Sequence, residues 1–192
     1  VPIATVNSSS AWAEAEWEAA PRLTHVLVEA ERSMFGRRFD RDLRAEIAAL
    51  EAARVSVAYL CHGTDIRDPR DHAMRTPGSP YPDDPRTDTL QADAEQNRAL
   101  LSELRRPTFV STPDLIDDVP WAQWCPVVVD AAPFAPREAP FRGAVPRVLH
   151  VSSSGVQKGT HLIAPVLEQL SAQGLIEYEL VTGAASADMP GR

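Results

Sequence analysis

Apolar residues along this chain recur at two spacings, one typical of helices and one typical of strands. Leu43, Ile47 and Leu50 fall four and three positions apart, so they form one apolar stripe on a helix, while Arg44 and Glu51 face water. Similar patterns predict four helices in all, at residues 11–20, 41–54, 89–105 and 160–172.

Short runs rich in Val, Leu and Ile alternate with these helices and predict strands. The run Val55–Cys61 is almost continuously apolar, which is typical of a parallel strand buried on both faces. The expected strands are residues 24–29, 55–61, 108–111, 124–129, 147–151 and 176–182. Strands that alternate with helices in this way predict an α/β fold.

Two proline-rich segments interrupt the alternation. Residues 65–87 contain five prolines and are expected to form a long loop, since this density excludes helix interiors and central strands. Residues 131–146 are interpreted as an interdomain linker between a domain at 1–130 and one βαβ unit at 147–192. That unit is too small to form a core alone, and neither end resembles a natural terminus. We therefore expect both domains to be incomplete in this chain.

Composition and charge narrow the classes of function. Hydrophobic residues make up 44% of the 192 residues, as in a globular protein, and the net charge of −8 disfavours binding of nucleic acid through its phosphates. No membrane-spanning run or signal peptide is recognisable, so a cytoplasmic location is expected, with at most peripheral membrane contact. Cys61 and Cys125 lie in strand-like runs and are expected to be buried free thiols. No Cys/His spacing fits a zinc site, so no metal ligand is predicted.

The segment Cys61–Arg67 (CHGTDIR) directly follows a predicted strand, and ligands of open α/β sheets bind at the carboxyl ends of strands. His62 and Asp65 are candidates for proton exchange or for hydrogen bonds to sugar hydroxyls. Gly63 permits a sharp turn, and Arg67 suits a phosphate or carboxylate. The alternative is a turn in which Asp65 caps a neighbouring helix and the arginine is solvated. No two carboxylates are spaced along the chain as an acid/base couple.

Residues 152–159 form a Ser/Gly-rich loop between a predicted strand and the start of a predicted helix. Backbone N–H groups there, with Gly155 and Gly159 for flexibility, favour an anion. Lys158 is the only lysine among 19 basic residues and adds a point charge suited to a diphosphate. The order Lys-Gly-Thr does not match the P-loop pattern. The alternative is an ordinary turn with a solvated lysine.

Three motifs in order resemble retaining nucleotide-sugar glycosyltransferases of the GT-B fold (glycosyltransferase family 1/4-like). Arg147–His161 (RVLHVSSSGVQKGTH) resembles the opening of their C-terminal domain. A subgroup there reads His-x-x-Ser-x-x-x-x-Lys-Gly-Thr, which this chain matches at His150, Ser153, Lys158, Gly159 and Thr160. His62–Arg67 resembles the subgroup's His-Gly-Ser-Asp-x-Arg stretch, and Ser111–Leu115 followed by Trp124–Asp130 resembles the end of its N-terminal domain.

The resemblance implies an enzyme of two Rossmann-like domains with its active site in the cleft between them. It implies transfer of a sugar, with retention of configuration, from a nucleotide-diphosphate sugar to an unknown acceptor: a glycan, a lipid or a small molecule. No cofactor is implied and usually no metal, because basic residues and helix N-termini stabilise the leaving diphosphate. It makes His62 and Asp65 the expected catalytic residues. The expected substrate-binding residues are Gly63, Thr64, Arg67, Ser153, Ser154, Gly155, Lys158, Gly159 and Thr160.

Two departures from the family pattern leave alternatives open. Many relatives have an arginine five residues before the lysine, where this chain has Ser153. The family's later Glu-x7-Glu segment is missing because the chain stops first, so the fragment alone is expected to be inactive. One alternative is a non-catalytic nucleotide- or carbohydrate-binding module on the same fold. Another is an unrelated Rossmann-like protein, such as a nucleotide-diphosphate epimerase.

Overall fold

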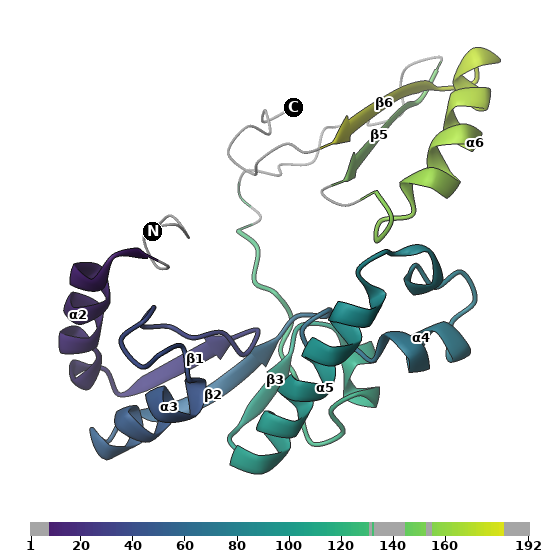
Figure 1. Ribbon diagram of the computed structural model, residues 1–192. Coiled ribbons are helices and arrows are strands. Elements are labelled where there is room, and N and C mark those ends of the chain that lie inside the picture. The colour runs from purple at the N-terminus through teal and green to yellow at the C-terminus, as the bar shows by residue number, and fades with distance from the viewer. Residues whose placement is uncertain (1–7, 131, 133–144, 153–154, 183–192) are drawn as a thin grey trace. The chain divides into compact units, whose positions relative to one another are not determined.

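The computed structural model of this protein describes residues 8–130, 132, 145–152 and 155–182 (Figure 1). The chain divides into two compact units. The first consists of the described residues of 1–69 and 88–127, and the second of the described residues of 70–87 and 128–192. The predicted linker at 131–146 lies largely outside the described residues, and its role stays a prediction.

The first unit is built on a parallel sheet of four strands in the order β1-β2-β3-β4 (Figure 1). In β1 and β2, residues from His25↔Ser56 to Glu29↔Leu60 are paired, so the two strands end at the same edge of the sheet. The mixed α/β fold with a parallel sheet is confirmed, and it is compatible with a Rossmann-like arrangement. The strands are β1 (His25–Glu29), β2 (Ser56–Cys61), β3 (Thr108–Val110) and β4 (Gln123–Trp124).

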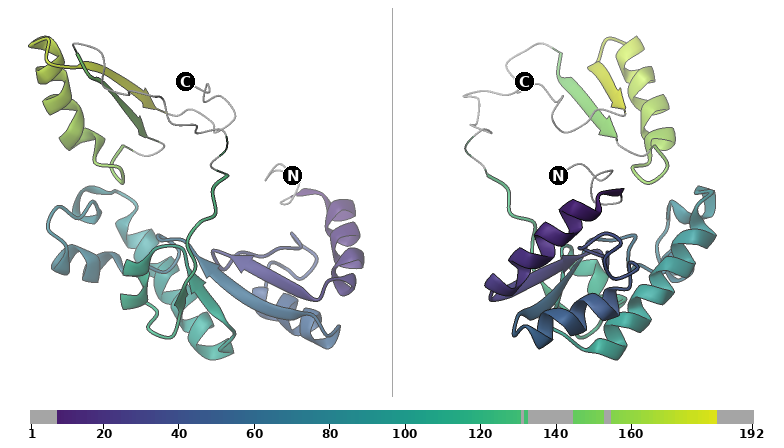
Figure 2. Two further views of the ribbon diagram at one scale, coloured as in Figure 1. Left: turned by 180° about the vertical axis from the view of Figure 1, so that it is seen from behind. Right: turned by 60° about the vertical axis from the view of Figure 1, so that its left-hand side comes forward.

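Helices α3 (Leu43–Ala52) and α5 (Thr87–Leu104) lie on the same side of this sheet in the views of Figures 1 and 2. The predicted apolar stripe of α3 is confirmed, because Leu43, Ile47 and Leu50 are all buried in the core. On β2, Val57, Tyr59 and Cys61 are buried whereas Ala58 and Leu60 are only partly buried, so the strand predicted to be buried on both faces is fully buried on one. Helix α2 (Ser10–Ala19) precedes β1, and its Trp17 packs edge-on against Phe35 and Phe39.

The prediction of one long loop over the proline-rich residues 65–87 is wrong. Residues 65–87 are not a continuous loop, since they contain α4 (Pro69–Arg75) and the 3-10 helix η2 (Tyr81–Asp83). Pro69 and Pro82 occupy the first and second positions of these helices, where a missing N–H group costs nothing.

The strand predicted at 124–129 is also wrong beyond its first residue. Strand β4 ends at Trp124, and Val127, Val128 and Val129 are exposed. Pro126 has no N–H to donate to a strand ladder, which accounts for the early end. Cys125 is an exposed free thiol, contrary to the expectation that it is buried, whereas Cys61 is buried as expected.

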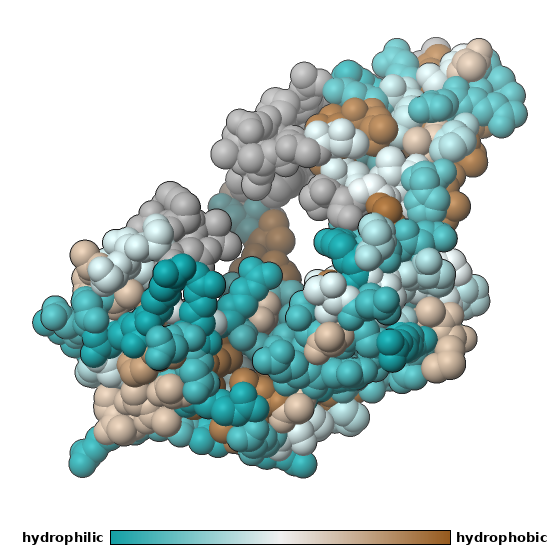
Figure 3. Space-filling model, viewed as in Figure 1, coloured by the Kyte–Doolittle hydropathy of each residue, from teal (hydrophilic) through white to brown (hydrophobic). Residues whose placement is uncertain are grey.

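The second unit contains the predicted βαβ element, made of β5 (Arg147–Ser152), α6 (Thr160–Ala172) and β6 (Glu177–Thr182). The strands β5 and β6 pair in parallel. Although α6 carries the expected apolar stripe, none of its residues is buried, and Leu162 is 60% exposed. Hydrophobic side chains therefore reach the surface of this unit (Figure 3, brown). None of the described helices has the length and apolar character needed to cross a membrane.

Candidate functional site

A cavity of about 580 Å³ opens in the first unit, at the edge of the sheet where β1 and β2 end. Residues after β1, residues after β2 and one side of α5 line it. Because the two strands are parallel and in register, segments 30 residues apart in sequence meet at this edge. The lining residues are Glu29–Arg32, His62, Thr64, Asp65, Leu90, Asp93, Gln96 and Asn97. Three predicted site residues, His62, Thr64 and Asp65, are therefore brought together.

The carboxylate of Asp65 holds the turn that follows β2. Its Oδ2 accepts a hydrogen bond from the backbone N–H of His62 at 2.8 Å, and its Oδ1 accepts one from the N–H of Gly63. Asn97 Nδ2 donates to the Asp65 carbonyl at 2.9 Å, which ties the turn to α5. Gly63 has φ +155°, where a side chain is strained, so the predicted sharp turn at this glycine is present. Asp65 therefore caps its own turn and not a neighbouring helix, as the alternative from the sequence had it, and it also lines the cavity.

His62 lines the cavity, whereas Arg67 does not. The imidazole of His62 is part-exposed, and its Nε2 lies 3.9 Å from Glu29 Oε1. Arg67 does not line the cavity, because its guanidinium forms an ion pair with Asp114 in the 3-10 helix η3 (Pro113–Asp117). This ion pair fastens the 62–67 turn to the segment after β3, a structural role that sequence spacing did not indicate.

The sequence did not reveal that Glu31 belongs to this site. Its side chain is 9% exposed, and Cys61 Sγ donates a hydrogen bond to Glu31 Oε1 at 3.2 Å. Burial, reinforced by the charge of Asp65, raises the pKa of Glu31 to about 8. Glu31 and Asp65 thus form a carboxyl pair, although no such couple was apparent along the chain. The feature of the sequence that could have indicated Glu31 is the acidic Glu-Ala-Glu run at the end of the first strand, which pairs with the strand that ends in Cys61.

The Ser/Gly-rich loop of the second unit is described only from Gly155, since Ser153 and Ser154 lie outside the described residues. Gly159 has the left-handed φ of +65° at the N-cap of α6. The N–H of Thr160 donates to the Gly155 carbonyl at 2.8 Å, so this amide is already used within the turn.

Of the side chains of this loop, Thr160 already has a partner, whereas Lys158 is exposed. The hydroxyl of Thr160 lies 2.9 Å from His150 Nε2, which connects the start of α6 to β5. The ammonium group of Lys158 is exposed, and across residues 8–130, 132, 145–152 and 155–182 no side-chain partner is found for it. The lysine is therefore the group of this loop that is best placed to meet an anion from solvent.

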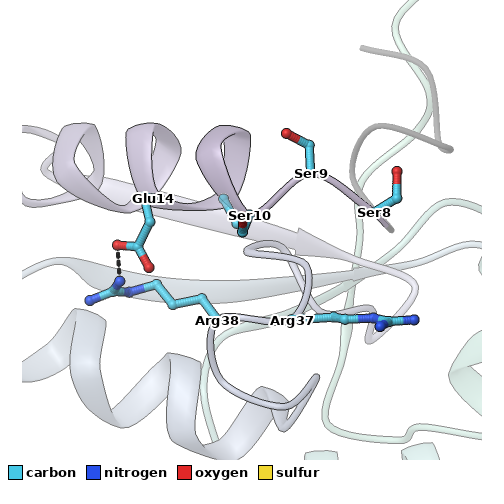
Figure 4. Close-up of a pocket in the computed structure, with 7 residues that line it drawn as sticks. Ser8, Ser9, Ser10, Glu14, Arg37 and Arg38 are labelled. Carbon is cyan, nitrogen blue, oxygen red and sulfur yellow. Dashed lines mark hydrogen bonds and ion pairs between the residues drawn. The ribbon is translucent and has the colours of Figure 1, made fainter.

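A second cavity, of about 320 Å³, lies between the start of α2 and the segment after Phe35 (Figure 4). One of its two arginines is neutralised, because Arg38 forms an ion pair with Glu14, and Arg38 also stacks over Trp17 at 5.5 Å. In Figure 4 the side chain of Arg37 points away from that of Arg38. Nothing in this lining resembles a proton-transfer pair, so we assign the functional site to the cavity at the strand ends.

Comparisons of the chain with protein-family models, with curated proteins and with solved structures found no match. We therefore infer the function from the residues, their geometry and the motif resemblance given above.

Proposed function

We propose that this chain is part of a retaining glycosyltransferase that uses a nucleotide-diphosphate sugar, with two Rossmann-like domains arranged as in the GT-B fold. The observation that carries the proposal is Lys158, an exposed cation in the loop between β5 and the N-terminus of α6. A phosphate there meets both the positive end of the helix dipole and the lysine charge. The resemblance of Arg147–His161 to a donor-site opening supports the same assignment.

The acceptor side of the proposal is the cavity at the ends of β1 and β2. We assign to His62 the contact with the acceptor or with the transferred sugar, because its ring is part-exposed at the cavity. Asp65 fixes the backbone amides of His62 and Gly63, and this supports a positioning role for its carboxylate. Thr64 adds a hydroxyl to the lining. Chemically, the bond between the anomeric carbon and the diphosphate oxygen breaks and a bond to the acceptor's hydroxyl oxygen forms on the same face. The hydroxyl proton passes to the departing diphosphate.

The proposal predicts that Lys158→Ala weakens binding of the donor. UDP-glucose, GDP-mannose and ADP-glucose are titrated separately into the 192-residue chain and followed by calorimetry. We expect at least one donor to bind, and the variant to lose about tenfold in affinity, since a charge-assisted contact is worth about 1.5–3 kcal/mol. Lys158→Arg should retain most of the affinity.

Arg147→Ala is the matched control, because it removes an exposed cation from the opposite end of β5, where Arg147 pairs with Glu177 and Glu179. Its donor affinity should equal that of the wild type. Equal affinity of Lys158→Ala and wild type contradicts the assigned role of the lysine. Donor binding by a longer form of the protein without any sugar transfer favours a binding module on the same fold.

A further inference from the structure

The part of the candidate cavity nearest the sheet brings together three side chains whose chemistry suits a metal ion. Cys61 is the last residue of β2, Glu31 follows the end of β1, and Asp65 lies in the turn after β2. One donor atom from each of the three lies within 4.8 Å of the other two. A thiolate together with two carboxylates is a ligand set compatible with zinc.

A second observation concerns one buried oxygen atom of this cluster. Glu31 is nine-tenths buried, and its Oε2 atom is fully shielded from solvent with no hydrogen-bond partner among the described residues. A buried carboxylate oxygen without a partner is costly, so native proteins seldom leave one unsatisfied. The backbone contributes as well, because Ala30 and Glu31 both adopt a φ of +51°, which is unusual for residues other than glycine.

We propose that Glu31, Cys61 and Asp65 bind a zinc ion at the cavity edge of the sheet. The Sγ of Cys61 lies 3.2 Å from Glu31 Oε1. Zinc bound tetrahedrally to sulfur and oxygen at about 2.3 and 2.0 Å would hold them about 3.5 Å apart, so little movement is needed. Three protein ligands leave one position for water or for an oxygen of a ligand in the cavity.

The surroundings of the cluster orient one of the ligands in advance. The carboxylate of Asp65 already accepts the backbone N–H groups of His62 and Gly63, and outer hydrogen bonds of this kind fix ligand orientation in metal sites. Zinc binds the thiolate form of cysteine, so its binding displaces the Cys61 thiol proton and releases it to the buffer.

This inference goes beyond glycosyl transfer and does not depend on it. Zinc binding is measured on the protein without a nucleotide sugar. The donor experiments on Lys158 involve the second unit, which contains none of the three proposed ligands. Failure of one proposal therefore leaves the other standing.

The test is titration of the 192-residue chain with zinc and, in parallel, with cobalt. We expect one zinc per chain, proton release on binding, and a near-ultraviolet thiolate-to-cobalt absorption band. Cys61→Ser should remove the band and weaken zinc binding by at least about tenfold. Cys125→Ser is the matched control, because Cys125 is an exposed free thiol that lies outside the cluster, and it should leave both readouts unchanged.

Three outcomes overturn the proposal: no zinc binding by the wild type, cobalt binding without a thiolate band, or loss of the band in Cys125→Ser rather than in Cys61→Ser. In each case Glu31, Cys61 and Asp65 do not bind zinc together. If circular dichroism shows that Cys61→Ser is unfolded, Glu31→Gln takes its place, with at least tenfold weaker zinc binding expected. Equal zinc affinity of folded Glu31→Gln and wild type overturns the assignment of Glu31.

Discussion

Replacement of Glu46 by alanine should lower the free energy of unfolding by about 3–5 kcal/mol. Glu46 lies in α3 and is completely buried. Its carboxylate accepts hydrogen bonds from Ser33 Oγ at 2.6 Å, from Met34 N at 2.8 Å and from Phe35 N at 3.2 Å. The substitution removes the acceptor of the Met34 and Phe35 N–H groups, whereas the Ser33 hydroxyl can still donate to the Gly36 carbonyl at 3.2 Å. Each unsatisfied buried donor costs about 1–3 kcal/mol. Urea denaturation followed by circular dichroism measures the loss.

The matched control for Glu46 is Glu103→Ala, which removes an exposed carboxylate paired with Arg44 at 2.7 Å. A surface ion pair of this kind contributes at most about 1 kcal/mol, so the control should unfold at nearly the wild-type urea concentration. A Glu46→Ala variant as stable as Glu103→Ala would show that the carboxylate does not organise the 33–35 segment.

Because of Glu31, the free energy of unfolding should fall as the pH rises through the neutral range. Burial first, and the charge of Asp65 second, raise the pKa of Glu31 from 4.5 to about 8 in the folded protein. Between these pH values the folded protein keeps the Glu31 proton and the unfolded chain releases it. The contribution of Glu31 to the free energy of unfolding is therefore complete below about pH 4.5 and is lost as the pH rises through about 8. Across about pH 5 to 8 the wild type should lose roughly 3 kcal/mol through this group.

Glu31→Gln removes the titrating group and should abolish that part of the pH dependence. Urea denaturation at several pH values, in the presence of a chelator to exclude metal, measures the difference between variant and wild type. Glu29→Gln is the control, since Glu29 lies on the same edge but its side chain is 68% exposed. Parallel pH profiles of Glu31→Gln and wild type would show that Glu31 is not protonated near neutral pH in the folded state.

The sequence predicted well those elements whose apolar spacing is regular over many residues. Leu43, Ile47 and Leu50 fall on one face only if the segment is helical, and in α3 that face is buried in the core. The βαβ element of the second unit was predicted as well. Residues 65–87 and 124–129 were less predictable, because proline acts differently at the first turn of a helix and inside a strand.

The candidate site was predicted only in part, because its geometry depends on which strands are neighbours. His62, Thr64 and Asp65 follow one strand and were identified from their local pattern. Glu31 and Cys61 are separated by 30 residues, and they meet only because β1 and β2 pair in parallel and end together. The involvement of Arg67 with Asp114 depends on tertiary packing in the same way, since 47 residues separate the two.

The most direct test of the proposed function is a map of backbone amide chemical shifts during titration with UDP, GDP and ADP. At least one nucleotide is expected to shift the amides of residues 155–163, at the loop containing Lys158 and the first turn of α6. The amides of α3, whose apolar face lies in the core of the first unit, should not move. If none of the three nucleotides shifts these loop amides while the protein remains folded, the proposed donor site is wrong.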